Sequence, residues 1–245
     1  MTTPFIVLQL CSWLMGIPLA FLVVAALIRG PWRQFPLVFL YAVAVFVITL
    51  VEIPLKVQYF ATGDAAVWHR AASIYWVDEI ILQVLIFALV IGLIDQAVSA
   101  GRRRRLIRAG LIVGVLVFGS TSFLIHYDPL AKYGDLMTQW TSDLNVCSTV
   151  LDLGLWAMLI ASRRSDRRLL LISGGLGMQF TGEAIGAAIR HLSAPSMAEA
   201  VSVAGSGVSG LADLACLYVW WQVFRPAPAH SPSPAAPPQP VGRRP

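Results

Sequence analysis

Charged side chains are scarce in this sequence. Asp, Glu, Lys and Arg together make up 13% of its 245 residues, whereas soluble proteins use about 25%. Because 57% of the residues are hydrophobic, too few charges remain to cover the surface of a water-soluble domain. This shortfall excludes the soluble classes and indicates an integral membrane protein.

Cysteine and catalytic motifs are also scarce. The three cysteines, Cys11, Cys147 and Cys216, fall in apolar segments without paired spacing, which argues against a disulfide framework or a zinc site. The chain contains no GxSxG, HExxH or CxxC motif. An intramembrane enzyme with Asp or Glu as acid or base stays open, but no nucleophile or metal set supports it.

The sequence gives no sign of a cofactor. Its four histidines, at positions 69, 126, 191 and 230, do not lie in the middle of apolar segments, where a membrane haem needs them. The last apolar segment has no lysine for a retinal Schiff base. We therefore expect no cofactor. The first apolar run lacks a basic n-region and a cleavage site, and we expect it to be retained as a span.

What the sequence does have is long apolar segments. A span needs about 20 apolar residues, and backbone groups in lipid must be hydrogen bonded within the segment. We predict an all-α fold, an integral membrane bundle of seven transmembrane helices, of which the fifth and seventh are the least apolar. The predicted spans are about 4–28, 35–56, 73–97, 106–126, 138–161, 168–189 and 200–224.

Basic residues predict the orientation. Fourteen of the 18 follow odd-numbered spans, chiefly in GRRRRLIR (101–108) and RRSDRR (163–168), and four lie at the opposite ends. The positive-inside rule then places the N-terminus outside and the C-terminus in the cytoplasm. These cytoplasmic Arg clusters suit anionic lipids of the bilayer. Their grouping between apolar runs does not suggest nucleic acid.

The chain divides into two parts. Residues 1–225 form the predicted seven-helix transmembrane domain. Residues 226–245, rich in Pro, Ala and Ser, are predicted to be a disordered Pro-rich cytoplasmic tail. A plain solvated tail is favoured over a docking segment.

Acidic residues occur inside the spans. Eight of the thirteen do so, although each carboxylate at mid-membrane costs about 2.5–3.5 kcal/mol on insertion scales. They must therefore turn inward, find partners or lie at the rim, where we place Asp95.

Helical spacing supports an inward orientation. Tyr75, Glu79 and Gln83 recur every four residues and share one helix face. Asp78 is expected to point away from Glu79, toward the outer interface. Glu52 lies four residues before Lys56, a spacing that suits an ion pair.

We therefore predict a polar cavity that opens outward between spans 2, 3, 5, 6 and 7. The alternative is that these groups only hydrogen bond one helix to another, at about 0.6 kcal/mol each. The ligand-binding candidates are Glu52, Lys56, Tyr75, Glu79, Gln83, Asn145, Asp152, Gln179, Glu183, Arg190 and Asp213.

Small residues predict one close helix contact. Gly182 and Gly186 form a GxxxG pair in the sixth span, and the seventh contains GSGVSG (205–210). Such surfaces let helix backbones approach closely. We expect the sixth span to pack on the seventh, with a homodimer face as the alternative.

Three stretches carry a resemblance to a known family. They are RQFPLVFLYAV (33–43), IYWVDEIILQVLIFALVIGLIDQAV (74–98) and NVCSTVLDLGLWAMLIAS (145–162). They resemble an uncharacterised family of bacterial seven-span integral membrane proteins. The resemblance implies seven helices, but no settled activity and no site residues. We expect the chain to be a multi-pass protein of the cell (inner) membrane.

Three functions fit these features. The first is a receptor-like or sensory module that binds a ligand from outside or couples to a membrane protein partner inside. The second is a secondary or proton-coupled transporter with Asp152, Glu183 and Asp213 as relay groups. An odd number of spans and the absence of a visible inverted repeat argue against it. The third is a structural subunit of a membrane complex.

Overall fold

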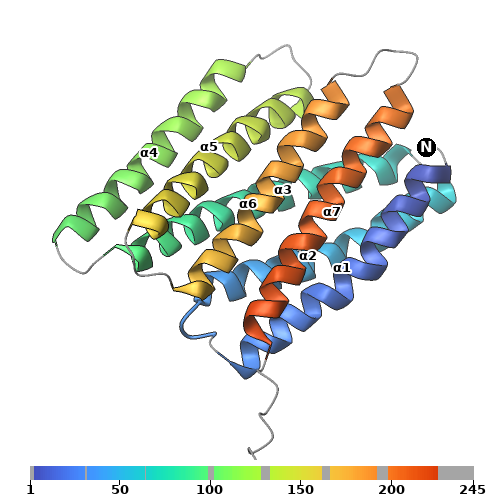
Figure 1. Cartoon of the computed structure of the whole chain (residues 1–245). Helices are drawn as coiled ribbons and strands as arrows, with labels where there is room; N and C mark the ends of the chain where they lie inside the picture. Colours follow the sequence, from blue (N-terminus) through green and yellow to red (C-terminus); the bar gives the residue numbers. More distant parts are fainter. Residues whose placement is uncertain are drawn as a thin grey trace, which may run out of the picture.

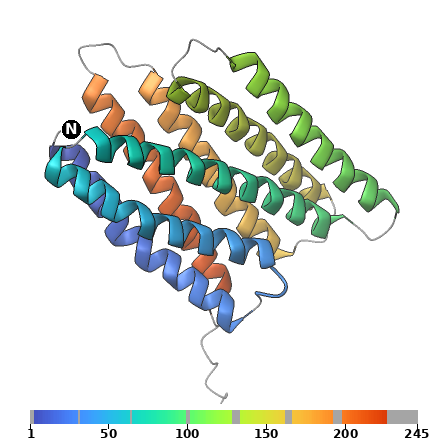
Figure 2. The same ribbon diagram turned by 180° about the vertical axis from the view of Figure 1, so that it is seen from behind.

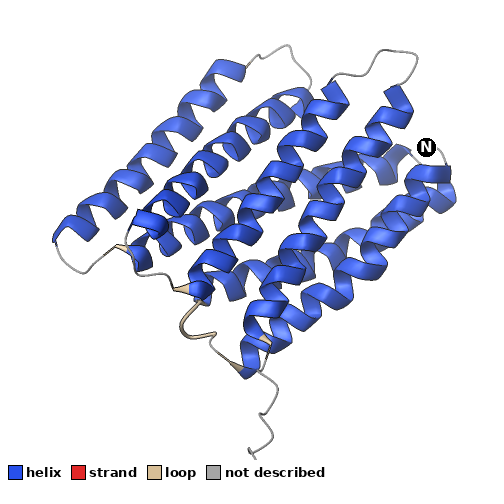
Figure 3. Cartoon of the chain, in the orientation of Figure 1, coloured by secondary structure: helices blue, strands red, loops and turns tan. Residues whose placement is uncertain are grey.

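The structure is a computed structural model in which every regular element is a helix (Figure 3). It describes residues 3–30, 32–63, 65–98, 102–127, 133–161, 166–191 and 198–225, and these ranges contain no strand. The tail predicted at 226–245 lies outside the described residues. The all-helical fold class is confirmed.

Seven helices follow one another along the described chain. α3 and α5 begin earlier than the sequence predicted, at residues 65 and 133, and the other bounds lie within a few residues of the prediction except at the end of α2. The helices are α1 (Thr3–Arg29), α2 (Pro36–Thr62), α3 (Ala65–Ala97), α4 (Arg102–His126), α5 (Tyr133–Ala161), α6 (Arg167–His191) and α7 (Ala198–Phe224).

Proline and glycine mark the ends of α2 and interrupt the hydrogen bonding inside α1 and α2. Pro36 occupies the first turn of α2, where a missing N–H is tolerated. Gly63 ends the helix in the left-handed conformation, with φ 64°, and its N–H donates to the Tyr59 carbonyl at 2.8 Å. Pro18 and Pro54 lie inside α1 and α2, where each leaves one backbone carbonyl without its helical donor.

Six of the seven described helices are long and apolar enough to cross a membrane. The helix that falls short is α6, whose sequence is rich in glycine and also carries Gln179, Glu183 and Arg190. The prediction that the fifth and seventh segments are the least apolar is therefore wrong. Neighbouring helices have to cover the polar face of α6.

The helices form a bundle in which consecutive helices run antiparallel (Figure 1). α1, α2, α3, α5, α6 and α7 each lie beside the next, and α7 closes back on α1 (Figure 1). α4 lies at the edge, against α3 and α5, and seen from behind, α2 and α3 cover the other side (Figure 2). α1 starts at what we call the N-terminal end. The opposite, arginine end carries Arg29, Arg33, Arg104, Arg105, Arg108, Arg167, Arg168 and Arg225.

Glycines bring α6 and α7 into backbone contact. A methyl group at Gly186 would lie 2.6 Å from the carbonyl oxygen of Gly205, and one at Gly182 would collide with Ala212. Closer to the arginine end, the indole of Trp220 fits against Gly175 and donates to the Ile172 carbonyl at 3.0 Å. The predicted packing of the sixth helix on the seventh is confirmed, and we call this contact the α6–α7 seam.

The hydrophobic core is concentrated toward the arginine end. Its fully buried members include Leu27 of α1, Leu93 of α3 and Trp220 of α7. Tyr41 packs edge-on against Trp220, with ring centroids 5.6 Å apart. Apolar side chains thus fill one half of the bundle.

We expect Gly182→Val to destabilise the protein, because the added side chain has to separate α6 from α7. Overpacking of this kind costs about 1–3 kcal/mol, which should lower the unfolding temperature in mild detergent by several degrees. Gly114→Val is the matched control, since a side chain at Gly114 of α4 meets no neighbour within 4 Å. Equal unfolding temperatures for the two variants would contradict the seam.

Candidate functional site

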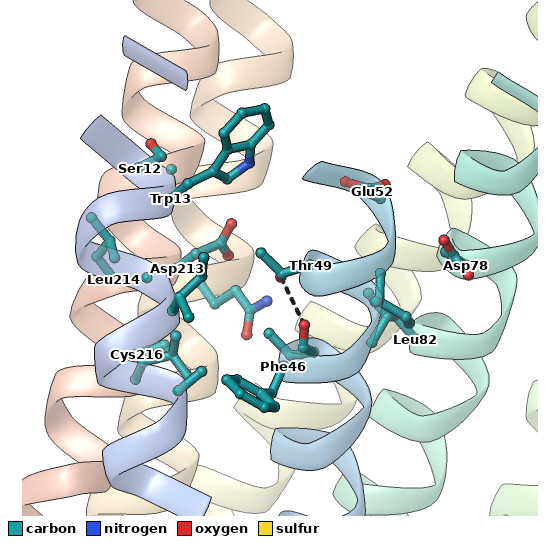
Figure 4. Close-up of a pocket in the computed structure, with 18 of the residues that line it drawn as sticks. Ser12, Trp13, Phe46, Thr49, Glu52, Asp78, Leu82, Asp213, Leu214 and Cys216 are labelled. Carbon is teal, nitrogen blue, oxygen red and sulfur yellow. Dashed lines mark hydrogen bonds between the residues drawn. The ribbon is translucent and has the colours of Figure 1, made fainter. Parts of the chain in front are cut away.

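A cavity of about 270 Å³ lies between α1, α2, α3, α6 and α7, on the N-terminal side of the hydrophobic core. Figure 4 shows Asp213 of α7 and Thr49 of α2 directed toward the same space. Aromatic and aliphatic side chains form the rest of the wall. The polar lining residues are Gln9, Ser12, Tyr41, Thr49, Glu52, Tyr75, Asp78, Glu79, Gln179 and Asp213.

One face of α3 supplies a continuous part of the wall. Tyr75, Asp78, Glu79 and Leu82 all line the cavity, and their spacing of three and four residues places them on one side of a helix. The expectation that Asp78 points away from the site of Glu79 is wrong. The i, i+3, i+4, i+7 pattern was the signal that could have identified Asp78.

Glu52 and Lys56 form the ion pair that the sequence predicted. Lys56 Nζ lies 2.5 Å from Glu52 Oε2 within α2. The same ammonium group lies 5.9 Å from the ring centroid of Trp13 on α1. Glu52 and Trp13 line the cavity, whereas Lys56 stands beside it. The pair therefore joins α2 to α1 at the cavity wall.

Three buried polar atoms on this wall have no hydrogen-bond partner. They are Asp78 Oδ2, Gln179 Oε1 and Asp213 Oδ1, and they are all such atoms among the side chains that the structure describes. Each belongs to a lining residue. Gln179 uses its other amide atom, since Nε2 donates to the Tyr41 hydroxyl at 3.0 Å. Buried acceptors without a donor are costly, by about 1–3 kcal/mol each, so hydrogen-bond donors would be favoured in this cavity.

α5 does not reach the cavity, and α1 takes its place. Asp152 is buried against α6, where Ser173 Oγ donates to its Oδ1 at 2.6 Å. Gln83 turns from α3 toward α5, and its Nε2 donates to Ser148 Oγ at 3.0 Å. Asn145 also lies outside the lining set. The expected enclosure by spans 2, 3, 5, 6 and 7 is thus corrected: α5 makes interhelical hydrogen bonds, as the alternative held.

Glu183 and Arg190 belong to the α6–α7 seam and do not line the cavity. Arg190 Nη1 donates to Ser209 Oγ of α7 at 3.5 Å, and Glu183 interacts with the same serine and with Arg190. Of the eleven predicted site residues, the cavity therefore brings together Glu52, Tyr75, Glu79, Gln179 and Asp213, with Lys56 adjoining.

Two further acids form hydrogen bonds that connect α4 to α3 and α5. Asp95 accepts two hydrogen bonds of 2.7 Å from Arg104 at the arginine end, which fits the rim position predicted for it. Asp143 accepts from Ser122 at 2.7 Å, and His126 Nδ1 lies 3.6 Å from it. Both acids have partners and neither lies at the cavity.

Sequence reasoning missed the contribution of α1. Gln9, Ser12 and Trp13 line the cavity from a helix that carries no acidic or basic residue before Arg29. Only the recurrence of polar or aromatic side chains at 9, 12 and 13 could have indicated its inner face.

The described residues contain no group of three His, Cys, Asp or Glu side chains that could hold a metal ion. Comparison with models of protein families, with curated proteins and with solved structures finds no match for the chain. The cavity and its chemistry therefore carry the functional argument.

We expect Ser173→Ala to destabilise the protein, because it removes the donor to the buried Asp152 carboxylate. The cost should be about 1–3 kcal/mol, measured as a lower unfolding temperature in detergent. Ser142→Ala is the control, since Ser142 is an exposed residue of the same α5 helix. A Ser173→Ala protein as stable as wild type would show that Asp152 does not depend on this bond.

Proposed function

We propose that the chain is a receptor-like or ligand-binding membrane module whose polar cavity opens to the outside of the cell. The observation that carries the proposal is the cavity of about 270 Å³ with its three unpartnered buried acceptors. If these polar side chains only held the helices together, the three acceptors would have hydrogen-bond donors on neighbouring helices, as Asp152 of α5 has in Ser173 of α6.

The proposal includes seven spans, with α6 as one of them. α6 has 25 residues, which at 1.5 Å per residue give about 37 Å, enough for a hydrocarbon layer of about 30 Å. It lies between α5 and α7. Its polar Glu183 and Arg190 interact within the seam, which supports placing this less apolar helix in the membrane.

The arginine distribution supports an outside N-terminus. Eight described arginines with described side chains gather at the arginine end, against Lys56, Arg70 and Arg190 toward the other. By the positive-inside rule the arginine end is cytoplasmic and the cavity faces outward. There the arginines would meet anionic lipids, at about 1 kcal/mol each, or a partner protein. An inner-membrane location belongs to the proposal, and membership of the bacterial family rests on the sequence resemblance.

The closed cytoplasmic half favours a receptor over a transporter. Beyond the cavity, buried side chains such as Leu93, Leu159 and Phe224 fill the space between the helices. Asp152, one of the three proposed relay groups, lies outside the cavity and is bonded to Ser173.

We expect a cysteine in the cavity to react with a membrane-impermeant thiol reagent added outside intact bacterial cells. The test uses a chain in which Cys11, Cys147 and Cys216 are replaced by Ala, with Ser12→Cys as the reporter. Ser12 lines the cavity near the start of α1, so water and reagent should reach it. Labelling is measured by mass shift on a gel.

Two further positions complete this experiment. Val113→Cys, on the exposed face of α4, should stay unlabelled because a thiol in lipid does not ionise. Arg108→Cys should react only after the cells are opened. A folded Ser12→Cys protein that does not react would overturn the outward cavity, and labelling of Arg108→Cys in intact cells would reverse the orientation.

A further inference from the structure

The charges on the cavity wall do not balance. Four carboxyl side chains line it, those of Glu52, Asp78, Glu79 and Asp213, and its described lining residues include no Lys, Arg or His. Lys56 is paired with Glu52, and Glu79 and Asp213 lie within electrostatic range of one another and of Glu183. Arg190 interacts with Glu183 in the seam. Asp78 lies within electrostatic range of Lys56, which leaves Glu79 and Asp213 as the two lining carboxyl groups without a basic partner. Carboxylates in this setting need a cation or a proton.

The unpartnered atoms identify the kind of cation. Asp78 Oδ2, Gln179 Oε1 and Asp213 Oδ1 are all acceptors, and each is fully buried. What they lack is an N–H or O–H donor. We propose that the ligand of this cavity is a small primary amine whose ammonium group donates hydrogen bonds to acceptors of this set; the inference rests on the proposed function and names its ligand class.

Aromatic rings complete the site for an amine. Trp13, Tyr41, Phe46 and Tyr75 line the same space, and ring faces attract cations within about 6 Å. The chain already provides one such arrangement, since the ammonium of Lys56 contacts the Glu52 carboxylate and lies over the Trp13 ring. An amine ligand would repeat this arrangement deeper in the cavity, beside Asp213.

Size limits the ligand. The cavity has a volume of about 270 Å³. This is below the usual range of about 300–1,000 Å³ for drug-sized ligands. A metal ion fits poorly, because no three acids among the described residues converge on one point. A short alkyl chain that bears one or two amino groups fits both the volume of the cavity and its dispersed carboxylates.

The test measures binding to the purified full chain in mild detergent, by calorimetry and by the unfolding temperature. The probes are 1-aminobutane, 1,4-diaminobutane, tetramethylammonium and 1-butanol. We expect both amines to bind and to raise the unfolding temperature. Tetramethylammonium, which has the charge but no N–H donor, should bind at least tenfold more weakly, and 1-butanol should not bind. Equal or tighter binding of tetramethylammonium would overturn the assignment.

Variants locate the binding. Asp213→Asn should weaken amine binding at least tenfold, because it removes a charge-assisted hydrogen bond. Asp143→Asn is the matched control, since Asp143 binds Ser122 outside the cavity, and should bind amines as wild type does. If Asp213→Asn does not fold, Asp78→Asn gives the same test at another unpartnered atom. Unchanged amine affinity in the folded cavity variant would place binding elsewhere and overturn the proposal.

Protection of the Ser12→Cys reporter by an amine distinguishes the proposal of an outward-opening cavity from the proposal of an amine ligand. Labelling that 1-aminobutane slows at least tenfold supports both. Labelling that no amine slows leaves the outward cavity standing and overturns the amine. A reporter that never reacts while the amines still bind the purified protein overturns the outward opening alone.

Discussion

The cost of placing carboxyl groups among hydrocarbon chains shapes this bundle. Each acid in a helix must be turned toward water, a donor or a partner charge, and that requirement fixes the rotation of its helix. Asp152 turns α5 toward Ser173 of α6, and Asp143 turns it toward Ser122 of α4. Asp78 and Glu79 turn α3 toward α1 and α2, around a space that no side chain fills. The same constraint therefore produces both the interhelical bonds and the cavity.

The bundle combines an apolar half with a polar half, and the apolar half stabilises the fold around the polar one. Side chains such as Leu27, Leu93 and Trp220 pack tightly at the arginine end, which holds the helices together where few polar bonds exist. The N-terminal half can then keep an open, charged space without losing the fold. The glycine contacts of α6 with α7 contribute where α6 has too few apolar residues to pack otherwise. Close backbone approach replaces side-chain burial there.

Local patterns predicted much of the fold and part of the site. Apolar length predicted all seven helices, the four-residue spacing predicted the Glu52–Lys56 pair, and GxxxG predicted the α6–α7 seam. Which helices meet around the cavity depends on tertiary packing, and no local spacing encodes it. For that reason α1 was missed and α5 was wrongly included. Gln83 shows the limit most clearly. It shares a stripe with Glu79, and both line a smaller cavity beside α4 and α5, yet only Glu79 also lines the polar cavity.

The prolines of α1 and α2 give the cavity walls unequal stiffness. α6 and α7 are locked by backbone contact along glycines, so neither can slide past the other without steric collision. Pro18 and Pro54 interrupt the hydrogen-bond ladders of the two helices opposite, close to the lining residues Ile17 and Glu52. Bending is cheapest at such breaks. The cavity therefore has one wall fixed by backbone contact and one wall that can bend at its prolines. Ligand binding would then change the tilt of α1 and α2, whose connection lies at the arginine end.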